Sequence, residues 1–327
     1  MKILVTGGSG FLGAHLIPSL ISNGHDVFAL ARSTSSSDRV RALGATPVHG
    51  DLDAPDTLSL PPIDAVVHAA ALFRFAGPRE PYFQANVVGT KALLAAAREA
   101  GAGAFVYISA AAVVMDDRGT PIRGVDESAP THPESFSAYI ASKSQGEAEV
   151  LAANAPGFRT IALRPPALWG PGGPFSEQIP TTLEAGRFAF IARGDYPYAT
   201  IHVDNVVEAI RCALDSDAGG RAYFISDPQT ITFREFVADH ATAVGLSIDG
   251  VRSVPYRLAF GAGRIMEYIA AIRGDHGDPP MSRTMVRLIG REFTPDDSAA
   301  RADLGYVGAT TRSDGLRSLA DGAHKGR

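Results

Sequence analysis

The sequence has a single cysteine, Cys212, so no internal disulfide can form. This scarcity indicates a reducing compartment, and we expect a cytoplasmic protein. An excess of positive charge is also lacking, because the formal net charge is −5, and this argues against a nucleic-acid partner. No stretch reaches the roughly 18 apolar residues of a membrane span. The longest candidate, residues 257–274, is interrupted by Arg264 and Glu267 and is predicted to be an amphipathic helix, so we expect no membrane partner.

Short apolar runs alternate with longer helical patterns over the first half of the chain. Strands are predicted at 2–6, 26–31, 64–70, 104–109 and 158–164, with helical patterns between them. This alternation predicts a parallel sheet with helices on both faces, and fully apolar strands are typical of such burial. The predicted fold class is therefore α/β, a Rossmann-type doubly wound parallel sheet.

The pattern changes after Arg164, where "RPPALWGPGGPF" is rich in proline and glycine. A strand and a helix return near residues 198–227, and residues 228–327 are less periodic. We therefore predict a Rossmann domain of residues 1–170 plus 198–227. A smaller, discontinuous C-terminal substrate lobe is predicted for residues 171–197 plus 228–327.

A glycine-rich turn, "TGGSGFLG" at residues 6–13, lies between the first predicted strand and the first predicted helix. Gly7, Gly10 and Gly13 are spaced by three residues. Such a turn lets the backbone approach a pyrophosphate, which then meets the free N–H groups and the positive dipole end of the helix. The context of strand before and helix after indicates a dinucleotide-binding turn.

Further motifs follow in order: "GDLDAP" (50–55), "HAAAL" (68–72), "NVVGT" (86–90), "YIASK" (139–143), "HVDNVVEA" (202–209) and "DLGY" (303–306). With the glycine turn, this series resembles the extended short-chain dehydrogenase/reductase family, also called the NAD-dependent epimerase/dehydratase superfamily, over essentially the whole chain. The segment "RPPALWGPG" resembles the 3β-hydroxysteroid dehydrogenase-like and carbonyl reductase members. The resemblance implies an NAD(P)-dependent oxidoreductase. The residues that it implies for cofactor binding are Gly7, Gly10, Phe11, Leu12, Arg32, Asp51, Leu52, Ala69, Ala70, Ala71, Asn86, Tyr139, Lys143 and Pro166.

Tyr139 and Lys143 stand four residues apart and therefore share one face of a helix. A free tyrosine has a pKa of about 10, and a nearby ammonium favours its phenolate. The resemblance implies that Tyr139 is the general acid/base of a hydride-transfer reaction and that Lys143 lowers its pKa and holds the nicotinamide ribose.

A hydroxyl that the family usually places just past the fifth strand is missing. Alignment of "AFVYISAAAVV" puts Ala110 at that position and Ser109 one residue earlier. Because a shift of one residue reverses a side chain in a strand, Ser109 either points away or serves through a relaxed strand end. Ser109 is therefore a candidate catalytic residue together with Tyr139 and Lys143.

The end of the second strand carries Arg32 and Ser33 and no carboxylate. An arginine there accommodates a 2′-phosphate, so NADP(H) is preferred and NAD(H) stays possible. Asp204 is predicted to N-cap the helix after "HVD", and His202 to lie on the preceding strand. No residues have the spacing of metal ligands, and no metal is expected.

The substrate is expected to be a small or hydrophobic ketone or alcohol, because Ala167 and Tyr198 stand where nucleotide-sugar enzymes of the family usually have a diphosphate-binding Asn and Arg. The aromatic residues that could line an apolar pocket are Phe73, Phe75, Trp169, Phe175 and Tyr198. A nucleotide-sugar epimerase or dehydratase and a non-catalytic NAD(P)-binding sensor stay open as alternatives. The resemblance also implies a homodimer through helices near 82–100 and 136–154.

Overall fold

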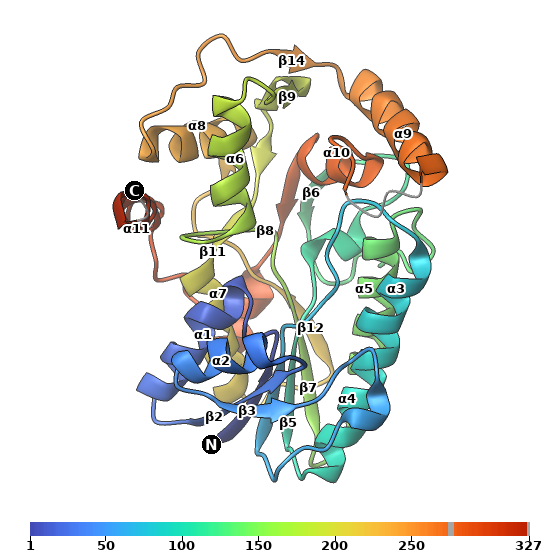
Figure 1. The fold of residues 1–327 in the computed structure, drawn as a ribbon, viewed down its shortest axis with the longest axis vertical. Coiled ribbons are helices and arrows are strands. Elements are labelled where there is room, and N and C mark those ends of the chain that lie inside the picture. Colours follow the sequence, from blue (N-terminus) through green and yellow to red (C-terminus); the bar gives the residue numbers. More distant parts are fainter. Residues whose placement is uncertain (274–277, 326–327) are drawn as a thin grey trace.

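The computed structural model describes residues 1–273 and 278–325, and its centre is a seven-stranded parallel sheet (Figure 1). The strand order is β12-β7-β5-β4-β1-β2-β3, so the order reverses on either side of β1. The bounds are β1 Lys2–Thr6, β2 Asp26–Ala31, β3 Thr46–His49, β4 Ala65–His68, β5 Ala104–Ile108, β7 Arg159–Arg164 and β12 Arg221–Phe224. The predicted doubly wound α/β fold is confirmed, and all five predicted strands are present within about two residues of their predicted bounds.

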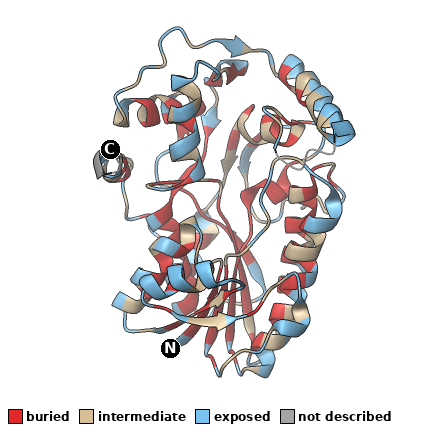
Figure 2. Cartoon of the chain, in the orientation of Figure 1, coloured by how far each residue is buried: buried red, intermediate tan, exposed pale blue. Residues whose placement is uncertain are grey.

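Helices cover both faces of this sheet, which is why its inner strands β1, β4, β5 and β7 are apolar and almost fully buried (Figure 2). One face packs against α1, α2 and α7, and the other against α4 and α5. The bounds are α1 Phe11–Ser22, α2 Thr34–Ala42, α3 Arg79–Phe83, α4 Gly89–Glu99, α5 Ala138–Ala152 and α7 Val203–Asp215. A π-helical turn, Gln84–Val88, joins α3 to α4, and short 3-10 turns lie at Pro55–Thr57 and Ala111–Val114.

A second, smaller body of short strands and helices lies over the carboxyl ends of the central strands. It contains a four-stranded sheet of order β13-β10-β15-β6 and two strand pairs, β8 with β11 and β9 with β14. The strand bounds are β6 Ile122–Val125, β8 Ala167–Trp169, β9 Phe190–Ile191, β10 Pro197–Tyr198, β11 Thr200–His202, β13 Ile231–Thr232, β14 Ser253–Val254 and β15 Phe293–Pro295. The helices are α6 Pro174–Glu184, α8 Phe233–Ala243, α9 Tyr256–Arg273, α10 Arg283–Ile289 and α11 Arg312–Lys325, with short turns at Ala192–Gly194 and Ala300–Leu304.

Two segments depart from a division of the chain at residue 170. β6 precedes that residue, yet it pairs with β15 in the smaller sheet. Ala300 and Leu304 of the turn at 300–304, with Tyr306, pack into the core cluster that contains β1, α1 and α7, although they follow most of the smaller body in sequence. The two bodies therefore exchange short segments, while the helix predicted at 257–274 is present as α9.

Candidate active site

The glycine turn between β1 and α1 has the backbone geometry that a bound diphosphate requires. Gly7 has φ +72°, and a Cβ there would lie 2.8 Å from the backbone nitrogen of Ala70. At Gly13 a Cβ would lie 2.3 Å from the Gly8 carbonyl oxygen, so helix and turn pack backbone to backbone. Gly10 is the N-cap of α1, no side chain caps this helix, and its first turn has no acidic residue. The positive end of the α1 dipole is therefore open to an anion.

A cavity of about 660 Å³ extends from this turn past the end of β2. The predicted cofactor residues that line it are Gly7, Arg32, Asp51, Leu52, Ala70 and Ala71. Arg32 is largely exposed and lies 3.7 Å from the Asp53 carboxylate, measured from Nη1 to Oδ2. The cavity thus has the place and the polarity for the adenosine half of a dinucleotide.

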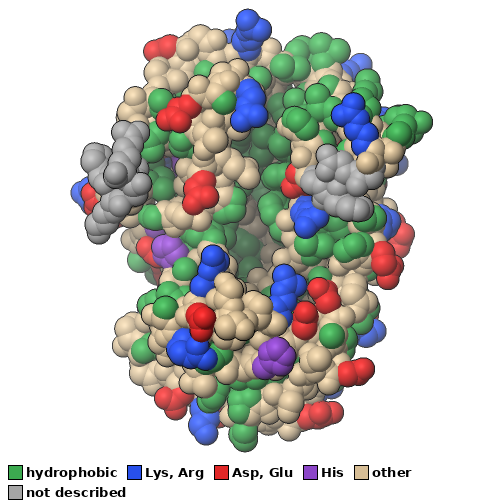
Figure 3. Space-filling view, in the orientation of Figure 1, with side chains coloured by type: hydrophobic (Ala, Val, Ile, Leu, Met, Phe, Trp, Pro, Cys, Tyr) green, Lys and Arg blue, Asp and Glu red, His purple; other side chains and the backbone are tan. Residues whose placement is uncertain are grey.

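A second cavity, of about 340 Å³, is predominantly apolar and lies at the carboxyl ends of β4 and β5. It brings together the predicted residues Phe11, Leu12, Ala69, Ala71, Ser109, Tyr139, Lys143 and Pro166. Phe73, Phe75, Phe175 and Tyr198 line it as well, and Figure 3 shows the hollow between the two bodies with hydrophobic side chains in its depth. Trp169 does not line it: the indole packs at 4.7 Å on the His202 ring and donates to Asp227 at 2.8 Å.

Tyr139 and Lys143 are held by α5, which Ser137 N-caps by accepting from the Ile140 N–H. The Tyr139 ring is half-buried and lies 4.8 Å from the Phe73 ring, and none of the described residues hydrogen-bonds to its hydroxyl. Burial raises the pKa of Tyr139 above its usual 10. The hydroxyl therefore keeps its proton and faces a cavity where a substrate oxygen could accept it.

The Lys143 ammonium is buried beside the strand end rather than bonded to the tyrosine. Its Nζ donates to the Ile108 carbonyl at 2.6 Å and lies 4.0 Å from the centre of the Tyr107 ring. Burial lowers the pKa of Lys143 to about 7, against the opposing effect of the Glu147 carboxylate. Lys143 can therefore gain or lose a proton near neutral pH.

The Ser109 side chain hydrogen-bonds to a buried ion pair between Glu147 and Arg164. Its hydroxyl donates to Glu147 Oε2 at 2.6 Å, and Arg164 donates to both oxygens of the same carboxylate, the shortest contact being 2.6 Å. The chain stays extended after β5, so Ser109 points toward α5 as Tyr107 does, and this geometry weighs against its predicted contact with substrate. Ala110 and Ala112 present methyl groups to the cavity instead. The sequence analysis did not predict Glu147 or Arg164 as part of the site. Two signals could have indicated them: Glu147 lies one helical turn after Lys143, and Arg164 is a charged residue at the end of a buried strand.

Two buried polar residues fix the turn after β4. His68 lies between Thr6 (2.7 Å) and Thr90 (2.9 Å), and burial lowers its pKa to about 3, so it is neutral. Asn86 accepts from the backbone N–H of Leu72 and donates to its carbonyl. The Asn86 side chain, predicted to bind cofactor, lines neither cavity and instead holds the residues that do.

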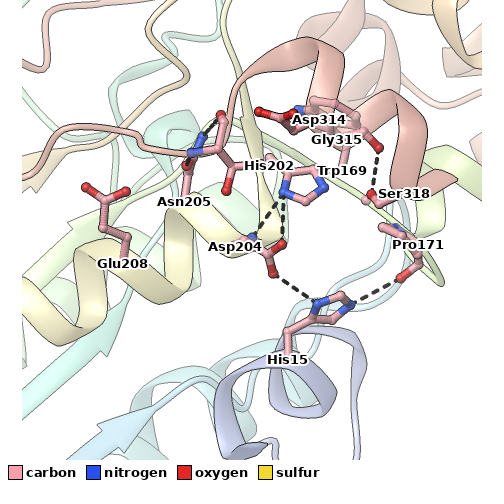
Figure 4. A network of polar contacts seen from close by, with 12 residues as sticks. His15, Trp169, Pro171, His202, Asp204, Asn205, Glu208, Asp314, Gly315 and Ser318 are labelled. Carbon is pink, nitrogen blue, oxygen red and sulfur yellow. Dashed lines mark hydrogen bonds and ion pairs between the residues drawn. The ribbon is translucent and has the colours of Figure 1, made fainter. Parts of the chain in front are cut away.

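A polar network joins α1 to the loop that enters the smaller body (Figure 4). His15 lies 3.2 Å from the Asp204 carboxylate and 3.3 Å from the Pro171 carbonyl. The Asp204 hydrogen bond raises the pKa of His15 above 6.5. The N-cap of α7 is His202, whose ring accepts from the Asp204 N–H, so the predicted N-cap at Asp204 is wrong. The helix begins at Val203, two residues earlier than expected, which leaves the Asp204 carboxylate free to reach α1.

Comparisons with known proteins identify the family of this chain. A family model described as the 3-beta hydroxysteroid dehydrogenase/isomerase family matches residues 4–256. The chain belongs to this family. A ketoreductase of Stigmatella aurantiaca, named for 4-hydroxy-2-methyl-3-oxo-4-farnesyl-3,4-dihydroquinoline-1-oxide, is 37% identical over 98% of this chain and 96% of its own. A 2-alkyl-3-oxoalkanoate reductase of Stenotrophomonas maltophilia is 34% identical over 98% of both chains.

Solved structures extend the agreement in fold beyond the 3-beta hydroxysteroid dehydrogenase/isomerase family. A dTDP-glucose 4,6-dehydratase of Streptomyces venezuelae with NAD bound has a TM-score of 0.77 over 100% of this chain and 98% of its own, at 23% identity. The predicted resemblance to extended short-chain dehydrogenases/reductases is thus confirmed. This member of the family is an NAD(P)-dependent oxidoreductase that interconverts a carbonyl and a secondary alcohol.

Proposed function

We propose that this enzyme reduces a ketone on a hydrophobic substrate with NADPH, and that Tyr139 is the proton donor. One observation carries the proposal: the Tyr139 hydroxyl has no partner among the described residues, and its side chain lines an apolar cavity shared with Phe11 and Leu12 at the start of α1. Bound NADPH would supply the hydride. The diphosphate would lie at the open end of α1, and the nicotinamide half near Lys143 and Pro166.

Side chains of the protein supply the proton, the positive charge and the apolar surroundings of the reaction. Tyr139 holds its proton because burial raises its pKa, and it delivers that proton to the carbonyl oxygen as the oxygen becomes an alkoxide. Lys143, with a pKa of about 7, can supply positive charge beside the tyrosine and replace the proton that it gives away. Ala110 and Ala112 line the cavity with methyl groups and have no hydroxyl to bind the substrate oxygen.

The aromatic lining of the cavity supports a hydrophobic ketone over a nucleotide sugar. Ala167 and the buried Tyr198 lie in the cavity wall where a diphosphate would need polar donors. The two bacterial relatives above are named as reductases of ketones that carry a farnesyl or an alkyl group. We therefore propose long-chain ketones as substrates. Turnover with UDP-sugars and none with alkyl ketones would contradict this.

Replacing Tyr139 with phenylalanine tests the mechanism, because it removes only the hydroxyl. Turnover should fall by at least about 10³-fold, while NADPH binding stays within about twofold. Tyr268→Phe is the matched control, since that exposed tyrosine lies on α9 and should keep full activity. Undiminished turnover in Tyr139→Phe would refute the mechanism and favour a non-catalytic NAD(P)-binding sensor.

The preference for NADPH is proposed from the end of β2. Arg32 and Ser36 line the adenosine-side cavity, and no carboxylate ends the strand. Asp53, the ion-pair partner of Arg32, opposes a 2′-phosphate. Arg32→Ala should weaken NADPH binding by about tenfold with little change for NADH, and Asp53→Asn should not weaken NADPH. Equal dissociation constants for NADPH and NADH in the unaltered enzyme would contradict the proposal.

A homodimer is proposed through α4 and α5. These helices pack together at the surface, where Lys91 pairs with Glu149 at 3.1 Å. Light scattering should give a mass near twice the 34.3 kDa of one chain. A monomer mass at micromolar concentration would reject the dimer.

A further inference from the structure

The exposed apolar side chains of this protein gather on one helix. Of the nine large hydrophobic side chains exposed within residues 1–273 and 278–322, five belong to α9. They are Leu258 (66% exposed), Ile265 (62%), Tyr268 (68%), Ile269 (41%) and Ile272 (68%). At 3.6 residues per turn, these positions fall within a sector of roughly 100°. They lie along one side of the helix, and we call these five residues the α9 stripe.

The opposite side of α9 attaches it to the protein. Ala259 and Gly263 are buried, and a Cβ at Gly263 would lie 2.8 Å from the backbone of Ser282. Glu267, the only acidic residue of α9, accepts from the backbone and side chain of Arg283 at 2.7 Å each. Because these contacts hold the opposite side of α9, the α9 stripe faces outward at the edge of the molecule (Figure 2).

The charged residues of α9 that flank the α9 stripe are all positive. Arg257, Arg264 and Arg273 are exposed, and the helical spacing places the first two on one side of the stripe and the third on the other. An apolar stripe with flanking arginines and an interfacial tyrosine is the composition of helices that lie in the surface of an anionic bilayer. A second copy of this chain fits less well, because a two-fold contact would bring together identical faces of α9, which carry arginines and no acidic residue beside the stripe.

The position of α9 links this surface to the active site. A cavity of about 400 Å³ is lined by Glu267, Ala270 and Ala271 of α9 on one side and by Phe75 and Tyr139 on the other. Tyr139 and Phe75 also line the apolar cavity described above. The helix that carries the α9 stripe on its outer side thus also forms one wall of a cavity that reaches Tyr139.

We propose that α9 docks the protein onto the surface of an anionic lipid bilayer, with the α9 stripe among the acyl chains and the arginines at the headgroups. This differs from spanning: no helix in the described part of the chain is both long and apolar enough to cross a bilayer. The expectation of no membrane partner rested on that criterion alone. The docking does not rest on the proposed function.

Vesicle sedimentation without cofactor or substrate tests the docking. The full chain should bind vesicles of phosphatidylcholine with one third phosphatidylglycerol at about 50 mM salt, and bind much less at about 500 mM salt or to phosphatidylcholine alone. Ile265→Ser with Ile272→Ser should weaken binding to the anionic vesicles by tenfold or more. Val307→Ser is the matched control, because Val307 is also 62% exposed but lies off α9. Arg264→Gln should weaken binding and its salt dependence.

The same variants separate docking from folding and from catalysis. The double variant should keep the far-UV circular dichroism, NADPH affinity and turnover of a short, water-soluble ketone of the unaltered enzyme. Equal vesicle binding by the double variant and the unaltered protein would overturn the proposal. So would a mass, measured by light scattering, that falls in the double variant while neither protein binds vesicles, since the α9 stripe would then join two copies. An inactive enzyme that still binds vesicles would refute only the proposed function.

Discussion

Replacing Lys143 with methionine should abolish turnover and nevertheless stabilise the fold at neutral pH. The Lys143 side chain is almost wholly buried, and burial lowers its pKa from 10.5 to about 7. In the unfolded chain the same amine is charged and hydrated at pH 7. Burying it therefore lowers the free energy of unfolding at that pH. Methionine has a similar length and no charge, and it should fill the same space beside Tyr107.

The size of the effect follows from the pKa. A fall of the Lys143 pKa from 10.5 to about 7 lowers the free energy of unfolding by roughly 4–5 kcal/mol at pH 7. Methionine loses the 2.6 Å hydrogen bond to the Ile108 carbonyl and the cation contact with Tyr107, a loss of about 1–3 kcal/mol. The free energy of unfolding of Lys143→Met at pH 7 should therefore exceed that of the unaltered enzyme by about 2–3 kcal/mol.

The dependence on pH identifies the cause. Between the folded pKa near 7 and the unfolded pKa of 10.5, the unfolded chain binds the proton and the folded chain does not, so the stability of the unaltered enzyme rises with pH through this group. The variant lacks this rise. Its advantage should shrink by roughly 1.4 kcal/mol for each pH unit and be close to zero at pH 9.

Urea unfolding followed by circular dichroism at pH 7 and pH 9 measures this difference. Tyr139→Phe is the control, because its effect on stability should be the same at both pH values. If Lys143→Met is less stable than the unaltered enzyme by equal amounts at pH 7 and pH 9, the buried ammonium does not oppose folding and the reasoning is refuted.

Three further changes test other parts of the site. Ala110→Ser adds a hydroxyl at the cavity wall and should raise turnover by tenfold or more, about 1.4 kcal/mol of transition-state stabilisation. An unchanged rate there, with a collapse in Ser109→Ala, would make Ser109 the donor. Glu147→Gln should lower the free energy of unfolding by about 3–5 kcal/mol, since it leaves the Arg164 guanidinium buried without its anion; a urea midpoint equal to that of the unaltered enzyme would contradict this. His15→Ala should cost about 0.5–1 kcal/mol at pH 5.5 and less at pH 8, because a histidine whose pKa is raised contributes below about pH 6.5 and loses that contribution as pH rises. Equal losses at both pH values in urea unfolding would show that the ion pair is not responsible.

The features that depend on neighbours in the chain could be predicted from the sequence. Apolar runs predicted five strands of the central sheet, because a strand buried on both faces needs no information about its partner. The glycine turn was predictable for the same kind of reason, since the positive φ of Gly7 and the open end of α1 are local properties. The spacing of Tyr139 and Lys143 by itself places both on one face of α5, because four residues are just over one helical turn.

The features that depend on what packs against a residue were decided by the tertiary structure alone. Ser109 points to Glu147 because α5 crosses the strand end there, and no local pattern specifies that crossing. Trp169 does not line the apolar cavity because His202 and Asp227, both distant in sequence, hold its ring. The sequence of α9 indicated an amphipathic helix but not which face is covered. The stripe faces outward because tertiary contacts cover the other side of α9, among them that of Gly263 with Ser282 and that of Glu267 with Arg283. Periodicity alone does not decide this, since a helix has the same periodicity whichever face its neighbours cover.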